Sequence, residues 1–131
     1  MIILDEQLLG RGIETEIARW YPGSVQFIVD LRPGTVIKDD AIPALLRQES
    51  SATFVTINVR DFWLKVEADK KYCLVCFSLN DSRVLEIPER LRFLFSHPAF
   101  GTKAERMGKV VRMSVESNSF YSVGEKAARA F

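Results

Sequence analysis

Short apolar runs alternate with helix-like segments through the first half of the chain, and this alternation constrains the fold more than any other feature. The run Tyr72–Phe77 is apolar at every position, as in a strand buried on both faces. Similar runs predict strands at Met1–Leu4, Val25–Leu31 and Thr53–Ile57. Strands that alternate with helices form βαβ units. The sequence therefore predicts an α/β fold with a mainly parallel central sheet flanked by helices.

The segments between these runs place apolar residues at helical spacing. They predict helices over Glu6–Trp20, Ala41–Glu49 and Asp61–Val66. Pro43 is compatible with the first turn of the second helix, and Asp39 or Asp40 is suited to cap it.

The pattern changes after Pro88. A helix is expected over Glu89–Ser96, and the strands Lys109–Glu116 and Ser119–Val123 are expected to form a C-terminal β-hairpin that turns at Asn118. Residues 125–131 suit a short helix or a frayed tail. A chain of 131 residues has the usual size of one domain, so we expect a single domain over residues 1–131.

The composition is that of a globular protein. Apolar residues make up 47% of the chain and charged residues 27%, which argues against disorder. The net charge of +1 neither indicates nor excludes nucleic-acid binding. No apolar stretch approaches the roughly 18 residues of a membrane helix. The first apolar run is interrupted by an acid at Asp5, so we expect no signal peptide. We therefore expect a cytoplasmic protein that does not enter a membrane.

Several familiar motifs are disfavoured. Cys73 and Cys76 lie three positions apart on a predicted strand and so point to opposite faces, which argues against a redox pair. His97 has no nucleophile motif near it and is interpreted as a loop residue. Gly10-Arg11-Gly12 lacks the third glycine of a phosphate-binding loop. The recurring aromatic residues are expected in the core rather than as stacking platforms: Trp20, Trp63, Phe93, Phe95 and Phe100.

Acid or amide side chains follow each of the four predicted strands. Ligands bind outside the carboxyl ends of parallel strands, so these side chains are expected to meet at one edge of the sheet. Such oxygen ligands suit Mg²⁺ or Mn²⁺, which activate water and neutralise charge on a phosphodiester. The same residues also suit helix caps and turns, and the pattern alone leaves both interpretations open. The residues are Asp5, Glu6, Asp30, Asp39, Asp40, Asn58, Asp61, Asn80 and Asp81.

Three segments resemble a small prokaryotic family of PIN-like nucleases. The segment Ile3–Leu8 looks like the Asp-Glu-Asn-Leu start of that family. Asp39–Ile42 resembles its Asp-x-x-Ile helix start, and Phe54–Phe62 is similar to its Val-Thr-x-Asp-x-Asp-Phe signature. The order of the segments also fits, and the resemblance covers roughly residues 2–77.

The resemblance implies a PIN-like domain that binds Mg²⁺ or Mn²⁺ and cleaves RNA, often as the toxin of a toxin–antitoxin pair. By position, Asp5 would be the central metal ligand with Glu6 beside it. Asp39 would hold the ion or position water, and Asp61 would complete the acidic pocket. The implied partners are an RNA substrate, an antitoxin protein and a second copy in a homodimer.

The third segment departs from the family pattern. Asn58 stands where the family has an acid, so it offers a carbonyl oxygen without a charge, and the spacing to Asp61 is one residue longer. Two functions follow. The first is an endoribonuclease with catalytic Asp5, Glu6, Asp39 and Asp61 and metal ligands Asp5, Asp39, Asn58 and Asp61. The alternative is a catalytically decayed PIN-like module that binds a protein partner or RNA.

The segment Lys103–Arg112 contains four cations that suit contacts with an RNA backbone: Lys103, Arg106, Lys109 and Arg112. The other interpretation is the solvated face of a hairpin.

Overall fold

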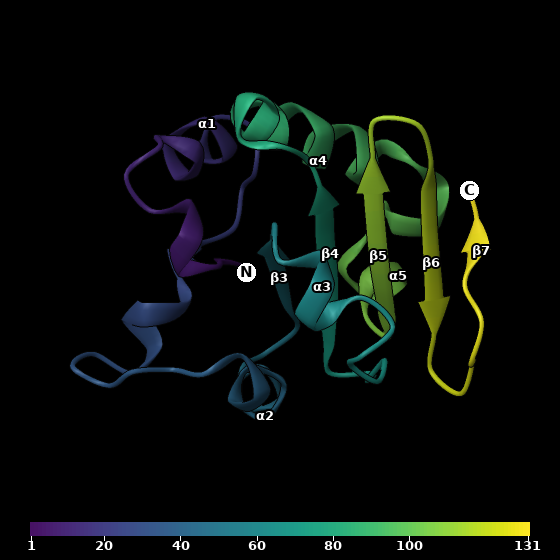
Figure 1. Ribbon diagram of the computed structural model, residues 1–131, viewed down its shortest axis with the longest axis horizontal. Helices are drawn as coiled ribbons and strands as arrows, with labels where there is room; N and C mark the ends of the chain where they lie inside the picture. The colour runs from purple at the N-terminus through teal and green to yellow at the C-terminus, as the bar shows by residue number, and fades with distance from the viewer.

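The computed structural model describes residues 1–131 and contains one mixed sheet with the strand order β2-β1-β3-β4-β5-β6-β7 (Figure 1). The first five strands are parallel, and the last two pair antiparallel with their neighbours. The predicted α/β class with a mainly parallel sheet is therefore confirmed. The strands are β1 (Ile2–Leu4), β2 (Val25–Phe27), β3 (Ala52–Thr56), β4 (Tyr72–Ser78), β5 (Lys109–Ser114), β6 (Asn118–Ser122) and β7 (Arg129–Ala130).

Helices cover both faces of this sheet. Apolar side chains of α1 and α4 pack in one core cluster, and those of α2 and α3 pack in the other. None of the helices combines the length and the apolar character needed to cross a bilayer. The α-helices are α1 (Ile13–Ala18), α2 (Ile42–Arg47), α3 (Val59–Phe62), α4 (Ile87–Ser96) and α5 (Lys103–Arg106).

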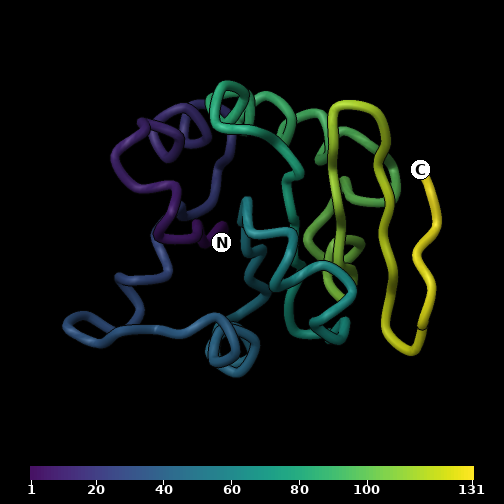
Figure 2. Tube along the Cα trace, in the orientation of Figure 1, coloured from purple at the N-terminus to yellow at the C-terminus, as the bar shows by residue number.

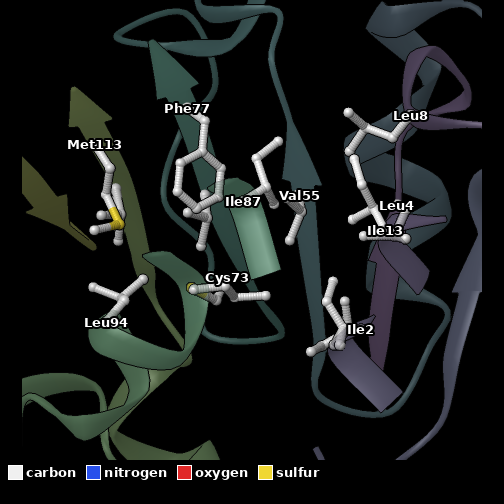
Figure 3. Packing of buried hydrophobic residues seen from close by; sticks show 14 of the residues in the cluster. Ile2, Leu4, Leu8, Ile13, Val55, Cys73, Phe77, Ile87, Leu94 and Met113 are labelled. Carbon is white, nitrogen blue, oxygen red and sulfur yellow. The ribbon is translucent and has the colours of Figure 1, made fainter. Parts of the chain in front are cut away.

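β4 shows why the apolar runs become central strands. Its side chains alternate between the two cores. Cys73, Val75 and Phe77 lie in the cluster shown in Figure 3, and Tyr72, Leu74 and Cys76 lie in the cluster on the opposite face. A strand buried on both sides must be apolar throughout. The same alternation confirms that the two cysteines point to opposite faces, where both are free thiols.

β1 lies between β2, which forms one edge of the sheet, and β3. The path of the chain through these strands can be followed in Figure 2. The chain passes from β1 to β2 on one side and then crosses to β3 on the other. The direction of winding therefore reverses between β1 and β3. In a parallel sheet, this reversal opens a crevice at the carboxyl ends of the two strands, where ligands commonly bind.

Two N-terminal elements are shorter than predicted. A 3₁₀ turn at Glu6–Leu8 and a loop precede α1, so the prediction of one continuous helix over Glu6–Trp20 is wrong. Gly10 and Gly12 adopt φ values of 76° and 75°, a left-handed conformation that interrupts a helix. The predicted strand Val25–Leu31 ends at Phe27, and a 3₁₀ turn follows.

Smaller differences concern the next two helices. A 3₁₀ turn at Asp39–Ala41 precedes α2, which has Pro43 in its first turn as predicted. A short helix does follow β3, but α3 starts earlier and is only four residues long, so the predicted bounds Asp61–Val66 are wrong. The chain leaves the helix at Trp63 because Leu64 adopts a left-handed conformation.

The C-terminal segment also differs from the prediction. β7 pairs with β6, so residues 125–131 form neither a helix nor a free tail. Phe131 packs its ring 4.9 Å from that of Phe100 and 5.6 Å from that of Phe120, measured between centroids. Asn118 is the first residue of β6 and not part of the turn. Phe93 is 65% exposed, so its predicted place in the core is wrong.

Replacing Leu64 with glycine is expected to stabilise the protein. It is 57% exposed and has φ 59°, a value that costs an ordinary L-residue free energy that glycine avoids. Leu64→Gly should therefore raise the free energy of unfolding by about 0.5 kcal/mol. Urea denaturation of the two proteins measures the difference. A clear loss of stability would show that the contacts of the leucine side chain outweigh the backbone strain.

Candidate functional site

Asp5 and Thr56 meet at the carboxyl ends of β1 and β3. Asp5 follows β1 and is only 3% exposed. Its backbone N–H donates to the carbonyl of Val55 at 2.9 Å, which extends the pairing between the two strands. Its Oδ2 accepts a hydrogen bond from the hydroxyl of Thr56 at 2.6 Å. The carboxylate is thereby fixed at the carboxyl edge of the sheet.

Asn58 extends this network to two further acids. Its Nδ2 donates to Oδ2 of Asp39 and to Oδ2 of Asp61, each at 2.9 Å. Its Oδ1 accepts from the backbone N–H of Asp61 at 3.2 Å and so caps α3. The N–H of Asn58 in turn donates to the hydroxyl of Thr56 at 2.9 Å. Asp5, Asp39 and Asp61 therefore belong to one hydrogen-bonded network.

Thr56 is a further residue of this network, and it was not predicted as a site residue. Its hydroxyl is fully buried, donates to Asp5 and accepts from Asn58. The signal was the hydroxyl of a threonine at the last position of a strand that leads to the predicted acidic edge.

The carboxylates of this network carry negative charge without a basic partner. Burial raises the pKa of Asp5 above its ordinary value of 3.8, and the hydrogen bond from Thr56 opposes this shift. Burial also raises the pKa of Asp39, together with the charge of Asp5 and the neighbouring carboxyl of Asp61. None of the ion pairs in the structure includes these three acids. The site therefore favours a proton or a cation.

Other acids from the sequence analysis lie apart or at the rim. Glu6 is exposed in the turn after Asp5, and its charge contributes to the raised pKa of Asp39. Asp30 instead accepts a hydrogen bond from the N–H of Phe27 at 3.2 Å. Asn80 accepts a hydrogen bond from the hydroxyl of Ser82 at 2.6 Å, as is typical of a turn. Only some of the strand-end polar residues therefore meet.

The donors at this edge suit a divalent cation in their chemistry but are not arranged as a closed cage. No three acid, histidine or cysteine side chains lie close enough together to hold an ion. Mg²⁺ often takes only one or two carboxylates and completes its shell with water and substrate phosphate. The amide of Asn58, however, directs N–H groups and not its oxygen toward the carboxylates of Asp39 and Asp61.

The basic segment lies mainly at the other end of the strands. α5 precedes β5 at the amino edge of the sheet (Figure 1). There, burial and the charges of Lys103 and Arg106 lower the pKa of the amino group of Met1. Arg106 is 6% exposed; it donates to the carbonyl of Phe100 at 3.0 Å and stacks on Phe95 at 3.9 Å. Its guanidinium therefore has internal partners in place of an RNA phosphate.

The other three cations are dispersed. Lys103 is exposed on α5. Lys109 is partly buried and donates to the carbonyl of Ala99 at 2.7 Å. Arg112 lies farther along β5 and donates to the hydroxyl of Ser78 at 3.4 Å. The structure does not gather the four into one surface beside the carboxylates.

No protein-family model, curated protein or solved structure matches this chain. Its function is therefore argued from the resemblance of three segments and from the geometry of the site.

The raised pKa of Asp39 predicts a pH-dependent stability. A carboxyl with a raised pKa in the folded state makes its most favourable contribution below the unfolded value of 3.8, and this contribution is lost as the pH rises through the folded pKa. Asp39→Asn removes the titration and retains an oxygen that can accept from Asn58. The melting temperature of the variant minus that of the metal-free wild type should therefore increase from about pH 4 to about pH 7. A constant difference would contradict the shift.

Proposed function

We propose that this chain is a metal-dependent endoribonuclease of the PIN-like type. The observation that carries the proposal is the network that joins Asp5, Asp39 and Asp61 at the carboxyl ends of β1 and β3 without a basic partner. The resemblance of the segments around these residues supports RNA as the substrate. It also supports a role as the toxin of a toxin–antitoxin pair and a homodimer, and the proposal includes the cytoplasmic location expected from the sequence.

Each residue of the network has a role that its position supports. Mg²⁺ or Mn²⁺ would be held by Asp39 and Asp61, with Asp5 adjacent, and would supply an activated water and positive charge toward the phosphodiester. Without metal, burial and the neighbouring acids raise the pKa of Asp39, so its negative charge is unfavourable and a bound cation would stabilise it. Thr56 orients Asp5, and Glu6 adds negative charge at the rim.

A catalytically decayed module is the second candidate, and the amide of Asn58 favours it. An N–H₂ group that donates to two carboxylates occupies the side on which a cation would require oxygen. In this alternative the edge binds a protein partner or RNA without cleaving it.

Metal-dependent cleavage of single-stranded RNA tests the proposal. A labelled RNA is incubated with the protein in Mn²⁺, in Mg²⁺ or in excess EDTA, and the products are separated on a denaturing gel. Cleavage is expected with either metal and not with EDTA. A folded protein that cleaves none of several RNAs with either metal would favour the decayed module.

A further inference from the structure

An open cleft of about 560 Å³ adjoins the carboxylate site on the face of the sheet covered by α2. Asp39 and Asp61 form part of its wall, so the cleft and the site are continuous. Arg47, the last residue of α2, and Lys65, in the loop after α3, line the same cleft. Two cations from different elements thus face one depression that leads to the acids.

The loop that carries Lys65 is held at several points. The hydroxyl of Tyr72 donates to the carbonyl of Glu67 at 2.7 Å, and the hydroxyl of Tyr121 donates to that of Val66. The N–H of Lys65 itself donates to the carbonyl of Phe62 at 3.2 Å. Burial raises the pKa of Tyr72 to about 12, so its hydroxyl remains a donor at neutral pH. The backbone on both sides of Lys65 is therefore fixed, while its ammonium makes no ion pair.

Arg47 is also available for a ligand. Its nearest acid is Asp69, at 3.9 Å, and 44% of its side chain is exposed. A guanidinium in a long and solvated ion pair loses little when it exchanges that partner for a phosphate. Its fork of N–H donors matches two phosphate oxygens.

We propose that this cleft binds the sugar–phosphate backbone of single-stranded RNA, with Arg47 and Lys65 contacting phosphates and leading the strand to the carboxylates. The inference rests on the proposed function, because it names the path of that substrate. Asp39, Asp40, Asp61 and Glu67 outnumber the two cations in the cleft. Binding is therefore expected to strengthen when a divalent cation neutralises the acidic end.

The test measures binding separately from cleavage. The Asp5→Asn protein, which is expected not to cleave, is titrated into a fluorescein-labelled single-stranded RNA in excess Mg²⁺, and anisotropy is recorded at several salt concentrations. Arg47→Gln and Lys65→Gln are added to this background, with Lys71→Gln as the matched control. Lys71 is exposed next to the same loop and does not line the cleft.

Each cleft variant is expected to weaken binding about 3- to 10-fold and to reduce the slope of log affinity against log salt by about 0.7, the value for one phosphate contact on a single strand. Lys71→Gln should change neither quantity. Arg47→Lys, which keeps the charge, should retain the slope. Circular dichroism of each variant shows whether it is folded.

The outcomes separate this inference from the proposed function. If Arg47→Gln and Lys65→Gln bind as Lys71→Gln does, the cleft is not the RNA path, whether or not the wild type cleaves. If they lose affinity and slope while the wild type cleaves no RNA in Mn²⁺, the cleft is confirmed as an RNA site and the nuclease proposal fails.

Discussion

Replacing Asp5 with asparagine is expected to abolish metal-dependent cleavage and to leave the protein at least as stable. Asp5 is buried between β1 and β3, and its charge has no basic partner. Asparagine keeps an oxygen for the hydrogen bond from Thr56 and removes the buried charge. Activity should fall about 100-fold or more, because a neutral side chain at this position weakens both metal binding and charge stabilisation.

Initial rates with Mn²⁺ and thermal melting of the metal-free proteins measure the two effects. Asp81→Asn is the matched control, since Asp81 is an exposed acid in the turn after β4. Loss of cleavage together with a retained or higher melting temperature is the pattern of a functional carboxylate held at a cost in stability. Equal rates for wild type and Asp5→Asn would remove Asp5 from the mechanism.

Asn58→Asp is expected to have the second largest effect. It should destabilise the metal-free protein and increase the affinity of the site for metal. The change replaces an N–H₂ group that donates to Asp39 and Asp61 with a third carboxylate. Without metal, the lost hydrogen bonds and the added repulsion should lower the free energy of unfolding by about 1–3 kcal/mol. The capping of α3 should persist, because aspartate is as good a cap as asparagine.

With metal, the same variant should gain affinity. A third carboxylate is expected to increase the affinity for Mn²⁺ about tenfold or more, which appears as a larger rise in melting temperature per added Mn²⁺. Asn80→Asp makes the same chemical change in the turn after β4 and serves as the control. A response no larger than that of the control would show that Asn58 does not face a metal position. Cleavage by Asn58→Asp but not by wild type would show that Asn58 disables the site.

The parallel core was predictable because its signals are local. β4 contains six consecutive apolar residues, Tyr72–Phe77, and such a run is stable only between two covered faces. The position of Asp5 at the carboxyl edge of the sheet was likewise predictable, because it directly follows a buried strand. By contrast, Gly10 and Gly12 separate the 3₁₀ turn from α1 through left-handed backbone angles, which helical spacing does not reveal.

Long-range contacts decided the remaining features. β7 forms because it pairs with the free edge of β6 and because the ring of Phe131 packs against Phe100 and Phe120. Arg106 is cationic like Lys103 and Lys109, yet its guanidinium is buried against Phe95 and Phe100. Both phenylalanines lie outside the helix that carries Arg106. Such partners come from separate elements, so the local pattern contains no record of them.

The sequence by itself determined which residues form the parallel sheet and which acids follow its strands, because periodicity and strand ends are properties of neighbouring residues. Only the tertiary structure decided that Asp5, Asp39 and Asp61 share one network while Asp30 and Asp81 do not. The reversal of winding brings the ends of β1 and β3 side by side, and the amide of Asn58 then joins acids that are far apart in the chain. The orientation of that amide depends on all of its hydrogen-bond partners at once, so it is defined only in the folded protein.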